Sequence, residues 1–295
     1  MALKEIDSSE LLSWRRRQLS EGGRAVDLDW LLEIAGGLSW SELQRVKVNL
    51  LELVVLEESL EHLSSLWRRH LDEHIPLQYL IGRCPWRDIE LEVNSSALIP
   101  RQETELLVDI ALSKVENNGL GTWADLGTGS GALAVALSRS LPEWVGHAVD
   151  CSQDALDLAE RNLQRLAGKA KWNLHCGNWW TPLKPWWGEL DLVLVNPPYI
   201  PSNLIGQLAP VVRDHEPRLA LCGGVNGLRE LRLVIAGAMK ALSPGGYLFL
   251  EHHHDQSDLV IDKMSQEGLK DLQFERDLNG VRRFALGRRP AALIP

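Results

Sequence analysis

The chain has 295 residues, of which 45% are hydrophobic and 24% are charged, so it can build one large core or two modest ones. Its formal net charge of −9 argues against a broad basic surface for duplex DNA, although a short basic strip is still compatible with it. The cysteines, Cys84, Cys151, Cys176 and Cys222, lack metal-type or disulfide-framework spacing, as is usual in a reducing cytoplasm. No apolar run approaches the roughly 18 residues of a membrane span, and the first residues lack a signal-peptide core. We therefore expect a cytoplasmic protein with no membrane association.

The first part of the chain, residues 1 to about 84, shows only helical periodicity. Helices are expected after Asp7, after Ser39 or Ser41, and along the amphipathic stretch 51–71. Helices of this kind can pack into a small bundle. Because this region contains no catalytic constellation, we assign residues 1–84 to an N-terminal helical domain that binds a protein partner.

Residues 85–100 change to a two-residue alternation. Ile89, Leu91 and Val93 alternate with polar residues before Asn94–Ser96 turns the chain. We expect a β-hairpin linker here, between the helical domain and the rest of the chain.

From residue 101 to residue 295, helical and strand patterns alternate. Strands are expected at 121–126, 145–150, 171–176, 190–195, 246–251, 271–276 and 281–287, and helices at 104–117, 131–140, 153–166, 226–242 and 255–267. This order predicts an α/β domain with a mostly parallel sheet and helices on both faces. The last two strands, separated by the turn signal Asn279-Gly280, should pair antiparallel at one edge.

A glycine-rich loop, "DLGTGSGALAVAL" at 125–137, follows the first strand of this domain. Its glycines permit a tight turn and allow a ligand to approach the backbone. The pattern also satisfies the loose fingerprint of a dinucleotide site, so a nicotinamide enzyme remains an alternative. Asp150, at the end of the next strand, can accept hydrogen bonds from both ribose hydroxyls, or it can cap the helix that begins near Ser152.

The acidic residue before the loop favours a cationic ligand. Asp125 would repel a pyrophosphate, but it would attract a ligand with an ammonium and a sulfonium group. S-adenosylmethionine carries both groups and an adenosine. The structural alternative is that Asp125 only accepts hydrogen bonds from the N–H groups of the loop.

The tetrapeptide Asn196-Pro197-Pro198-Tyr199 ends the buried strand 190–195. Proline cannot continue a central strand, which explains the prolines but neither the asparagine nor the tyrosine. The carboxamide oxygen of Asn196 and the backbone carbonyl of Pro197 can accept from a planar NH₂ group, and Tyr199 offers a face on which that group stacks. The pattern therefore predicts methylation of an amide or base nitrogen.

Over nearly its whole length the chain resembles the release-factor glutamine methyltransferases, the PrmC/HemK-type protein-(glutamine-N5) methyltransferases. The resemblance rests on "ALIPRQETELLVDIAL", "DLGTGSGALAVAL", "NPPYIP" and "VRDHEPRLALCGGVNGL", in the order and spacing of that family. It implies a Rossmann-like S-adenosylmethionine-dependent methyltransferase fold. It also implies that the substrate is the glutamine of the Gly-Gly-Gln motif in class-I peptide chain release factors.

The resemblance places the cofactor beside Gly127, Thr128, Gly129, Ser130, Gly131 and Asp150, with Asn178 and Trp179 at the adenine. With Asp125 and Asn196, these are the expected cofactor-binding residues. The expected substrate-binding residues are Asn196, Pro197, Pro198 and Tyr199, of which Asn196, Pro197 and Tyr199 are expected to be catalytic.

Two positions depart from the family pattern. Asn178 stands where the family usually has an aspartate, and His252–His254 replaces a segment that usually contains a glycine. Consecutive side chains in an extended segment point in alternating directions, so we expect a structural or solvent-facing role for these histidines and no metal site.

Three rival functions remain open at this level. The tetrapeptide also occurs in nucleic-acid methylases that act on an exocyclic base nitrogen, but the acidic N-terminal region offers no evident surface for a phosphate backbone. A nicotinamide dehydrogenase has no use for the tetrapeptide. A non-catalytic release-factor-binding protein would need neither motif. We expect a monomer that binds no nucleic acid directly.

Overall fold

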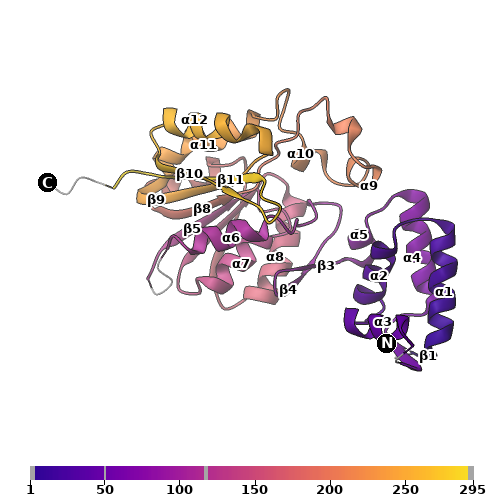
Figure 1. Ribbon diagram of the computed structural model, residues 1–295. Helices are drawn as coiled ribbons and strands as arrows, with labels where there is room; N and C mark the ends of the chain where they lie inside the picture. Colours follow the sequence, from indigo (N-terminus) through magenta and orange to yellow (C-terminus); the bar gives the residue numbers. More distant parts are fainter. Residues whose placement is uncertain (1–3, 50, 116–118, 292–295) are drawn as a thin grey trace. The chain divides into compact units, whose positions relative to one another are not determined.

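The computed structural model describes residues 4–49, 51–115 and 119–291. The chain forms two compact units (Figure 1). The first contains residues 1–83 together with 209–215, and the second contains residues 84–208 and 216–295. No described helix is both long and apolar enough to cross a membrane.

The first unit contains helices and one small sheet. Its helices are α1 (Ser8–Glu21), α2 (Ala25–Ile34), α3 (Trp40–Lys47), α4 (Leu60–Glu73), α5 (Leu77–Ile81) and the later segment α9 (Pro210–Arg213). The caps follow the sequence signals, because Asp7 accepts from the N–H of Ser9 at the start of α1 and Ser39 forms a capping box at the start of α3. Trp67 is fully buried in the hydrophobic core of this unit.

The prediction that this region is entirely helical was wrong. Strands β1 (Lys4–Asp7) and β2 (Leu53–Leu56) pair antiparallel, with Lys4 opposite Leu56. Val54 is buried and Val55 is about half exposed, so the short run "LVVL" follows a two-residue period. The pairing joins segments that are about fifty residues apart, and local helical periodicity carries no signal of such a partner.

Strand β3 (Arg83–Trp86) starts at the last residue of the first unit and pairs with β4 (Ile89–Glu92) of the second. The predicted strand from Ile89 is present, but its partner precedes it and contains Pro85, which hid that strand in the sequence. The predicted turn at Asn94 also forms, because the N–H of Ser96 donates to Asn94 Oδ1 at 2.9 Å. Residues 97–100 after this turn are irregular.

The described residues of the second unit also form a seven-stranded sheet with the order β10-β11-β9-β8-β5-β6-β7. These strands are β5 (Thr122–Leu126), β6 (Val145–Asp150), β7 (Lys171–Cys176), β8 (Leu190–Val195), β9 (Leu242–Glu251), β10 (Lys270–Arg276) and β11 (Arg282–Arg288). The strands from β9 to β7 run parallel, whereas β11 is antiparallel to both of its neighbours. The predicted parallel sheet and its antiparallel final pair are therefore confirmed.

Helices cover both faces of this sheet, as predicted. In Figure 1, α11 and α12 lie over one face, and α6, α7 and α8 lie on the other. The helices of this unit are α6 (Glu105–Leu112), α7 (Ala132–Ser140), α8 (Gln153–Ala167), α10 (Arg218–Leu221), α11 (Arg229–Ala241) and α12 (Ser257–Gln266), with 3-10 helices η1 (Thr181–Trp186), η2 (Ile205–Gln207) and η3 (His254–Gln256).

Helix α6 is shorter than predicted. It ends at Leu112, where the hydroxyl of Ser113 donates to the carbonyl of Ile110 and replaces a helical hydrogen bond. The last predicted residues of this helix, 116 and 117, lie outside the described residues.

The strand order places the ligand crevice. The chain runs from β5 outward to β6 and β7, and then returns to place β8 on the other side of β5. Open parallel sheets bind ligands beyond the carboxyl ends of strands at such a reversal. The glycine loop follows β5 and the tetrapeptide follows β8, so the topology brings both motifs to this crevice.

Candidate active site

The glycine loop joins β5 to α7 in a conformation that needs glycine. Gly127, Gly129 and Gly131 have φ values of 77°, 54° and 83°. The N–H groups of Gly127 and Thr128 both donate to the carbonyl of Val149, at 2.8 and 2.9 Å. A Cβ on Gly131 would approach the backbone of Ala159 to 3.2 Å, so this glycine also permits the close packing of α7 on α8.

Asp125 is fully buried beneath the loop. Its Oδ2 accepts from Thr128 Oγ1 at 2.6 Å and from the N–H of Ala134 at 3.1 Å. Its Oδ1 is buried and accepts no hydrogen bond from the described part of the chain. Burial raises the pKa of this carboxyl to about 7, although both hydrogen bonds oppose that shift. Asp125 therefore holds the loop, as the structural alternative requires.

Asp150 ends β6 and connects two segments at the crevice. Its Oδ2 accepts from the N–H of Gly129 at 2.9 Å, and its Oδ1 accepts from the N–H of Ser152 at 3.0 Å. The helix cap is supplied by Ser152, whose hydroxyl accepts from the N–H of Ala155, so Asp150 does not cap α8 directly. A carboxylate has about four acceptor positions, so each oxygen of Asp150 can accept a further hydrogen bond.

Trp179 follows β7 in a left-handed backbone conformation, with φ of 44°. This conformation is unfavourable for a bulky residue and is held by surrounding contacts. Its Nε1 donates to Glu230 Oε2 at 2.8 Å, and a Cβ on Gly127 would lie 3.3 Å from its ring. Because Gly127 has no side chain, the indole of Trp179 can pack close to the backbone of the loop. The preceding residue, Asn178, is exposed.

The tetrapeptide follows β8 at the same end of the sheet. Strand β8 is fully buried from Leu192 to Val195, as its composition predicted. Asn196 Nδ2 donates to Thr104 Oγ1 at 3.1 Å, and the hydroxyl of Tyr199 donates to Glu251 Oε1 at 3.1 Å. Burial raises the pKa of Tyr199, and the negative charge of Glu251 acts in the same direction.

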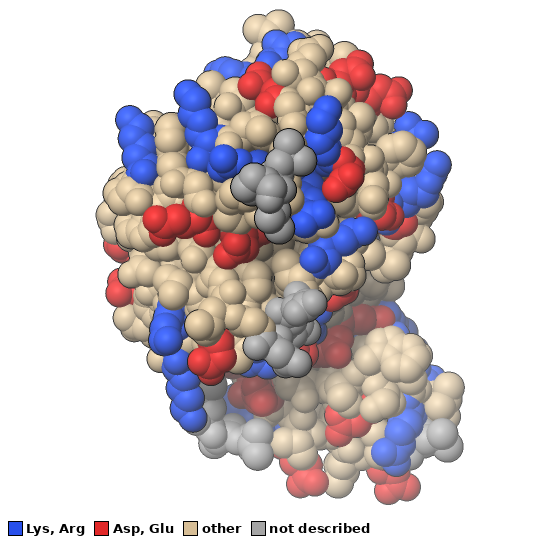
Figure 2. All heavy atoms as spheres, turned by 90° about the vertical axis from the view of Figure 1, so that its left-hand side faces the viewer, with Lys and Arg blue, Asp and Glu red and all other residues tan. Residues whose placement is uncertain are grey.

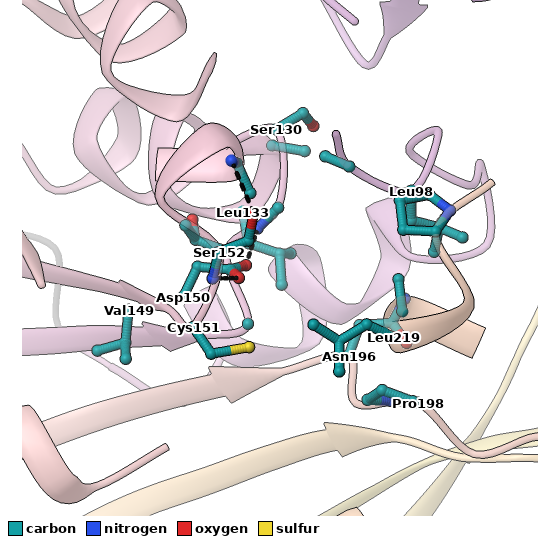
Figure 3. A pocket seen from close by; sticks show the side chains of 18 of the residues that line it. Leu98, Ser130, Leu133, Val149, Asp150, Cys151, Ser152, Asn196, Pro198 and Leu219 are labelled. Atoms are coloured by element: carbon teal, nitrogen blue, oxygen red, sulfur yellow. Dashed lines mark hydrogen bonds between the residues drawn. The ribbon is translucent and has the colours of Figure 1, made fainter. Parts of the chain in front are cut away.

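These elements surround one cavity of about 350 Å³. Figure 3 shows Asp150 and Cys151 on one side of it and Asn196 and Pro198 on the other. The predicted site residues that line it are Gly127, Thr128, Gly129, Ser130, Asp150, Asn178, Trp179, Asn196 and Pro198. The predicted site residues outside this lining are Asp125, Gly131, Pro197 and Tyr199.

Sequence reasoning missed Thr104 and Glu251. Thr104 lines the cavity, and its hydroxyl donates to Glu251 Oε2 at 2.7 Å. Glu251 ends β9 and is buried, which raises the pKa of its carboxyl, while the hydrogen bonds from Thr104 and Tyr199 oppose that shift. The sequence did carry one signal for Glu251, because a carboxylate at the end of an apolar strand indicates a functional position.

Arg101 and Glu216 form a second link at the cavity wall. Arg101 NH2 lies 2.7 and 2.8 Å from the two carboxylate oxygens of Glu216, which is buried. Glu216 also accepts from the N–H of Ile99 at 3.3 Å. This ion pair joins the irregular segment before α6 to the segment that carries α10, and both segments line the cavity.

The three consecutive histidines have separate surroundings. His252 is buried and bonded to the carbonyl of His253, whereas the ring of His253 lies 2.6 Å from Asp255. Among the described residues, no three His, Cys, Asp or Glu side chains are arranged to hold a metal ion.

The charge on one face of the molecule is mixed in sign. On the face drawn in Figure 2, Lys and Arg side chains lie among Asp and Glu side chains. With a net charge of −9, this face does not have the single-sign basic surface typical of proteins that bind duplex DNA.

Comparison with known proteins connects this geometry to methyl transfer. The family model described as "Methyltransferase small domain" matches residues 102–206. A release factor glutamine methyltransferase of Prochlorococcus marinus is 60% identical over 287 residues, which cover 97% of this chain and 98% of the relative. A protein of Synechocystis with the same name is 37% identical over 298 residues, covering 96% of this chain and 97% of the relative.

One solved structure extends the comparison to the fold. The hMettl16 catalytic domain, crystallised with the MAT2A 3′UTR hairpin 6, superposes with a TM-score of 0.54 and 13% identity, covering 79% of this chain and 82% of that chain. At this identity the likeness concerns the methyltransferase fold alone.

Proposed function

The chain belongs to the release factor glutamine methyltransferase family, and from that premise we propose its reaction and substrate. It transfers a methyl group from S-adenosylmethionine to the side-chain amide nitrogen, N5, of the glutamine in the Gly-Gly-Gln motif of class-I peptide chain release factors. The observation that carries the proposal is that Asn196 lines the same cavity as Asp150 and the glycine loop.

One side of the cavity, here called the loop side, is formed by the glycine loop, Asp150, Asn178 and Trp179. These residues fit S-adenosylmethionine. Asp150 keeps free acceptor positions for the two ribose hydroxyls, and Gly127 and Gly129 bring backbone to the cavity without side chains. Trp179 and Asn178 would contact the adenine, and the buried Asp125 would favour the ammonium and sulfonium charges from beneath the loop. When bound, this group supplies a methyl carbon whose bond to sulfur breaks with both electrons remaining on sulfur.

The tetrapeptide side would hold and orient the substrate amide. An amide nitrogen is a weak nucleophile because its lone pair is delocalised. Asn196 Oδ1 and the backbone carbonyl of Pro197 would accept from the NH₂ group, aim the nitrogen and offset the positive charge that it develops. Pro198 lines the cavity beside Asn196, and Tyr199 would support the plane of the amide. Proximity and alignment provide most of the remaining acceleration.

The N-terminal unit would recognise the release factor rather than take part in the chemistry. It has its own core, and it exposes apolar side chains, including 64% of Trp40. A Gly-Gly-Gln segment is small, so a second contact surface would add selectivity by raising its effective concentration at the cavity. We infer a partner-binding role for residues 1–84 on this basis.

One assay tests the reaction. The enzyme is incubated with methyl-labelled S-adenosylmethionine and a purified release factor, and the product is mapped by mass spectrometry. We expect one methyl group on the glutamine of the Gly-Gly-Gln motif, and none when that glutamine is replaced by alanine. A parallel reaction contains DNA or RNA in place of the release factor. Methylation of the nucleic acid would favour the alternative function, a methylase that acts on an exocyclic base nitrogen.

A further inference from the structure

Hydrogen bonds link both ends of the tetrapeptide to the buried carboxylate of Glu251, directly from Tyr199 and through Thr104 from Asn196. Asn196 Nδ2 donates to Thr104 Oγ1 at 3.1 Å, and Thr104 Oγ1 donates to Glu251 Oε2 at 2.7 Å. The hydroxyl of Tyr199 donates to the other oxygen, Glu251 Oε1, at 3.1 Å. Asn196 follows β8 and Glu251 ends the adjacent β9, where Val195 pairs with Leu250, so the sheet register places the two side by side.

The hydroxyl of Thr104 does not serve its own helix. Thr104 occupies the N-cap position of α6, where a threonine side chain commonly accepts from a backbone N–H. Here it makes no capping hydrogen bond. Its side chain is 5% exposed, and its hydroxyl is bonded to Glu251 and Asn196 instead.

The structure gives these hydrogen bonds one consistent direction. Thr104 donates its single hydroxyl hydrogen to Glu251 Oε2, as an ionised carboxylate, which only accepts, requires. The threonine oxygen then offers only lone pairs to Asn196. A carboxamide can meet a lone pair with its NH₂ group but not with its oxygen, so Nδ2 of Asn196 must face Thr104.

The opposite side of the Asn196 carboxamide is therefore its oxygen. Among the described residues, none donates a hydrogen bond to Oδ1 of Asn196, and Asn196 lines the cavity. With the reverse orientation, Asn196 would present an NH₂ group to the NH₂ group of a substrate amide, and two donors would face each other. The orientation decides whether the site can bind an amide nitrogen.

We propose that Glu251 and Thr104 are positioning residues that set the orientation of the Asn196 carboxamide and thereby select glutamine over glutamate. The inference rests on the proposed function. A glutamate side chain in place of the substrate glutamine would bring acceptor oxygens to the Asn196 oxygen, and two acceptors cannot form a hydrogen bond with each other. A site that leaves polar groups mismatched in this way discriminates strongly.

The structural alternative is that the hydrogen bond from Thr104 only compensates for the cost of burying the Glu251 carboxyl group. In that case its loss would lower stability and disturb the cavity generally, without a specific effect on amide recognition. The two roles differ in their dependence on Asn196 and in the choice between glutamine and glutamate.

The test uses matched variants of the full chain. Thr104→Val removes the hydroxyl at nearly constant shape, Thr104→Ser retains it, and Thr104→Ala is a second deletion of the hydroxyl should the valine variant fail to fold. Methylation of release factor gives kcat and KM, and calorimetry gives the Kd for S-adenosylhomocysteine. A release factor with its Gly-Gly-Gln glutamine replaced by glutamate serves as a competitive inhibitor.

Thr104→Val should lower kcat about tenfold or more, as expected for a misaligned transition-state partner, and should leave the Kd for S-adenosylhomocysteine within about twofold. Thr104→Ser should return kcat to within about threefold of the unsubstituted enzyme. Without the hydroxyl oxygen that accepts from Asn196 Nδ2, the carboxamide of Asn196 can rotate. The glutamate-containing release factor should then inhibit Thr104→Val several-fold better, relative to its KM for the natural substrate.

A double-mutant cycle shows whether Thr104 acts through Asn196. In the Asn196→Ala background, Thr104→Val should cause no further loss of kcat, because the group that it orients is absent. Additive losses, equal defects in the serine and valine variants, or an unchanged preference for glutamine over glutamate would overturn the inference while leaving the proposed function intact. If the unsubstituted enzyme does not methylate glutamine, the proposed function fails and this inference fails with it.

Discussion

The two sides of the cavity are held in different ways. On the loop side, the hydrogen bonds of Asp125 and Asp150 reach partners within 21 residues along the chain. On the tetrapeptide side, Asn196 and Tyr199 are bonded to residues 92 and 52 positions away. The glycine loop and its two carboxylates are therefore a local structure of consecutive strand, turn and helix, although Trp179 beside them is hydrogen-bonded to Glu230, 51 residues away. The tetrapeptide side needs α6 and β9 to be in place.

This difference has a consequence for substitutions. A change on the loop side should affect cofactor binding, because its carboxylates position the backbone of the loop. A change on the tetrapeptide side should affect turnover, because its hydrogen bonds orient the group that meets the substrate. Substitutions on the two sides should therefore separate the Kd for the cofactor from kcat.

The largest effect should come from Asn196→Ala. Loss of one preorganised acceptor for the reacting nitrogen should reduce kcat by at least about 100-fold. The Kd for S-adenosylhomocysteine, measured by calorimetry, should change little if Asn196 acts on the substrate. A fully active variant would remove the support for the catalytic role of the tetrapeptide.

Asp150→Ala should show the opposite pattern. Loss of a charged hydrogen-bond acceptor should weaken the binding of S-adenosylhomocysteine by about 1.5–3 kcal/mol, which raises its Kd about 10- to 150-fold. Asp150 also accepts from the N–H groups of Gly129 and Ser152, so part of this loss would arise from a loosened loop. Asp150→Asn separates the two contributions, because its carboxamide oxygen can still accept from one of these groups. Unchanged cofactor affinity in both variants would contradict the assignment.

Neither side of the cavity should select the whole release factor, if the N-terminal unit does so. Removing residues 1–83 is a poor test, because residues 209–215 belong to the same compact unit and would lose their partner. Trp40→Ala removes an exposed aromatic side chain instead, and should raise KM for intact release factor about tenfold if this residue lies in the contact. KM for a short Gly-Gly-Gln peptide should not change. Leu278→Ala, at an exposed residue of the second unit, is the matched control.

The pH dependence of cofactor binding tests Asp125. Burial raises its pKa to about 7, so the free enzyme carries mostly the protonated form at pH 6. A cationic ligand that favours the ionised form would release this proton on binding, and its Kd would fall by up to about eightfold between pH 6 and about pH 7.5. Asp125→Asn should lack this component of the dependence. If both proteins give the same pH profile for S-adenosylmethionine, Asp125 has only its structural role.

The smallest effect on turnover should come from Tyr199→Phe. The aromatic face remains, so kcat should stay within about threefold, whereas Tyr199→Ala should be severe. The phenylalanine leaves Glu251 Oε1 without the hydroxyl donor, which should lower the free energy of unfolding by about 1–3 kcal/mol. Urea denaturation measures this loss. A large drop in kcat for Tyr199→Phe would mean that the hydroxyl takes part in the reaction.

The alternation of helices and strands in the second unit, and the two motifs at the cavity, could be predicted from the amino-acid pattern alone. The boundaries of β6 (Val145–Asp150) and β8 (Leu190–Val195) were predicted to the residue. For β8 the reason is that its aliphatic run is ended by the proline signal. The order of the parallel strands then brings Asp150 and Asn196 to one crevice, so the composition of the cavity was largely predictable.

The hydrogen bonds that hold these residues in place could not be predicted from the sequence. Nothing local indicates that the hydroxyl of Thr104 turns from its own helix to Glu251, or that β1 pairs with a segment expected to be helical. The tertiary structure also places Asp125 below the loop, and it leaves Pro197 and Tyr199 outside the lining of the cavity. Periodicity reports how each segment meets its own surroundings. Hydrogen bonds across 52 to 92 residues depend on which strands and helices become neighbours, and that is settled only when the sheet is assembled.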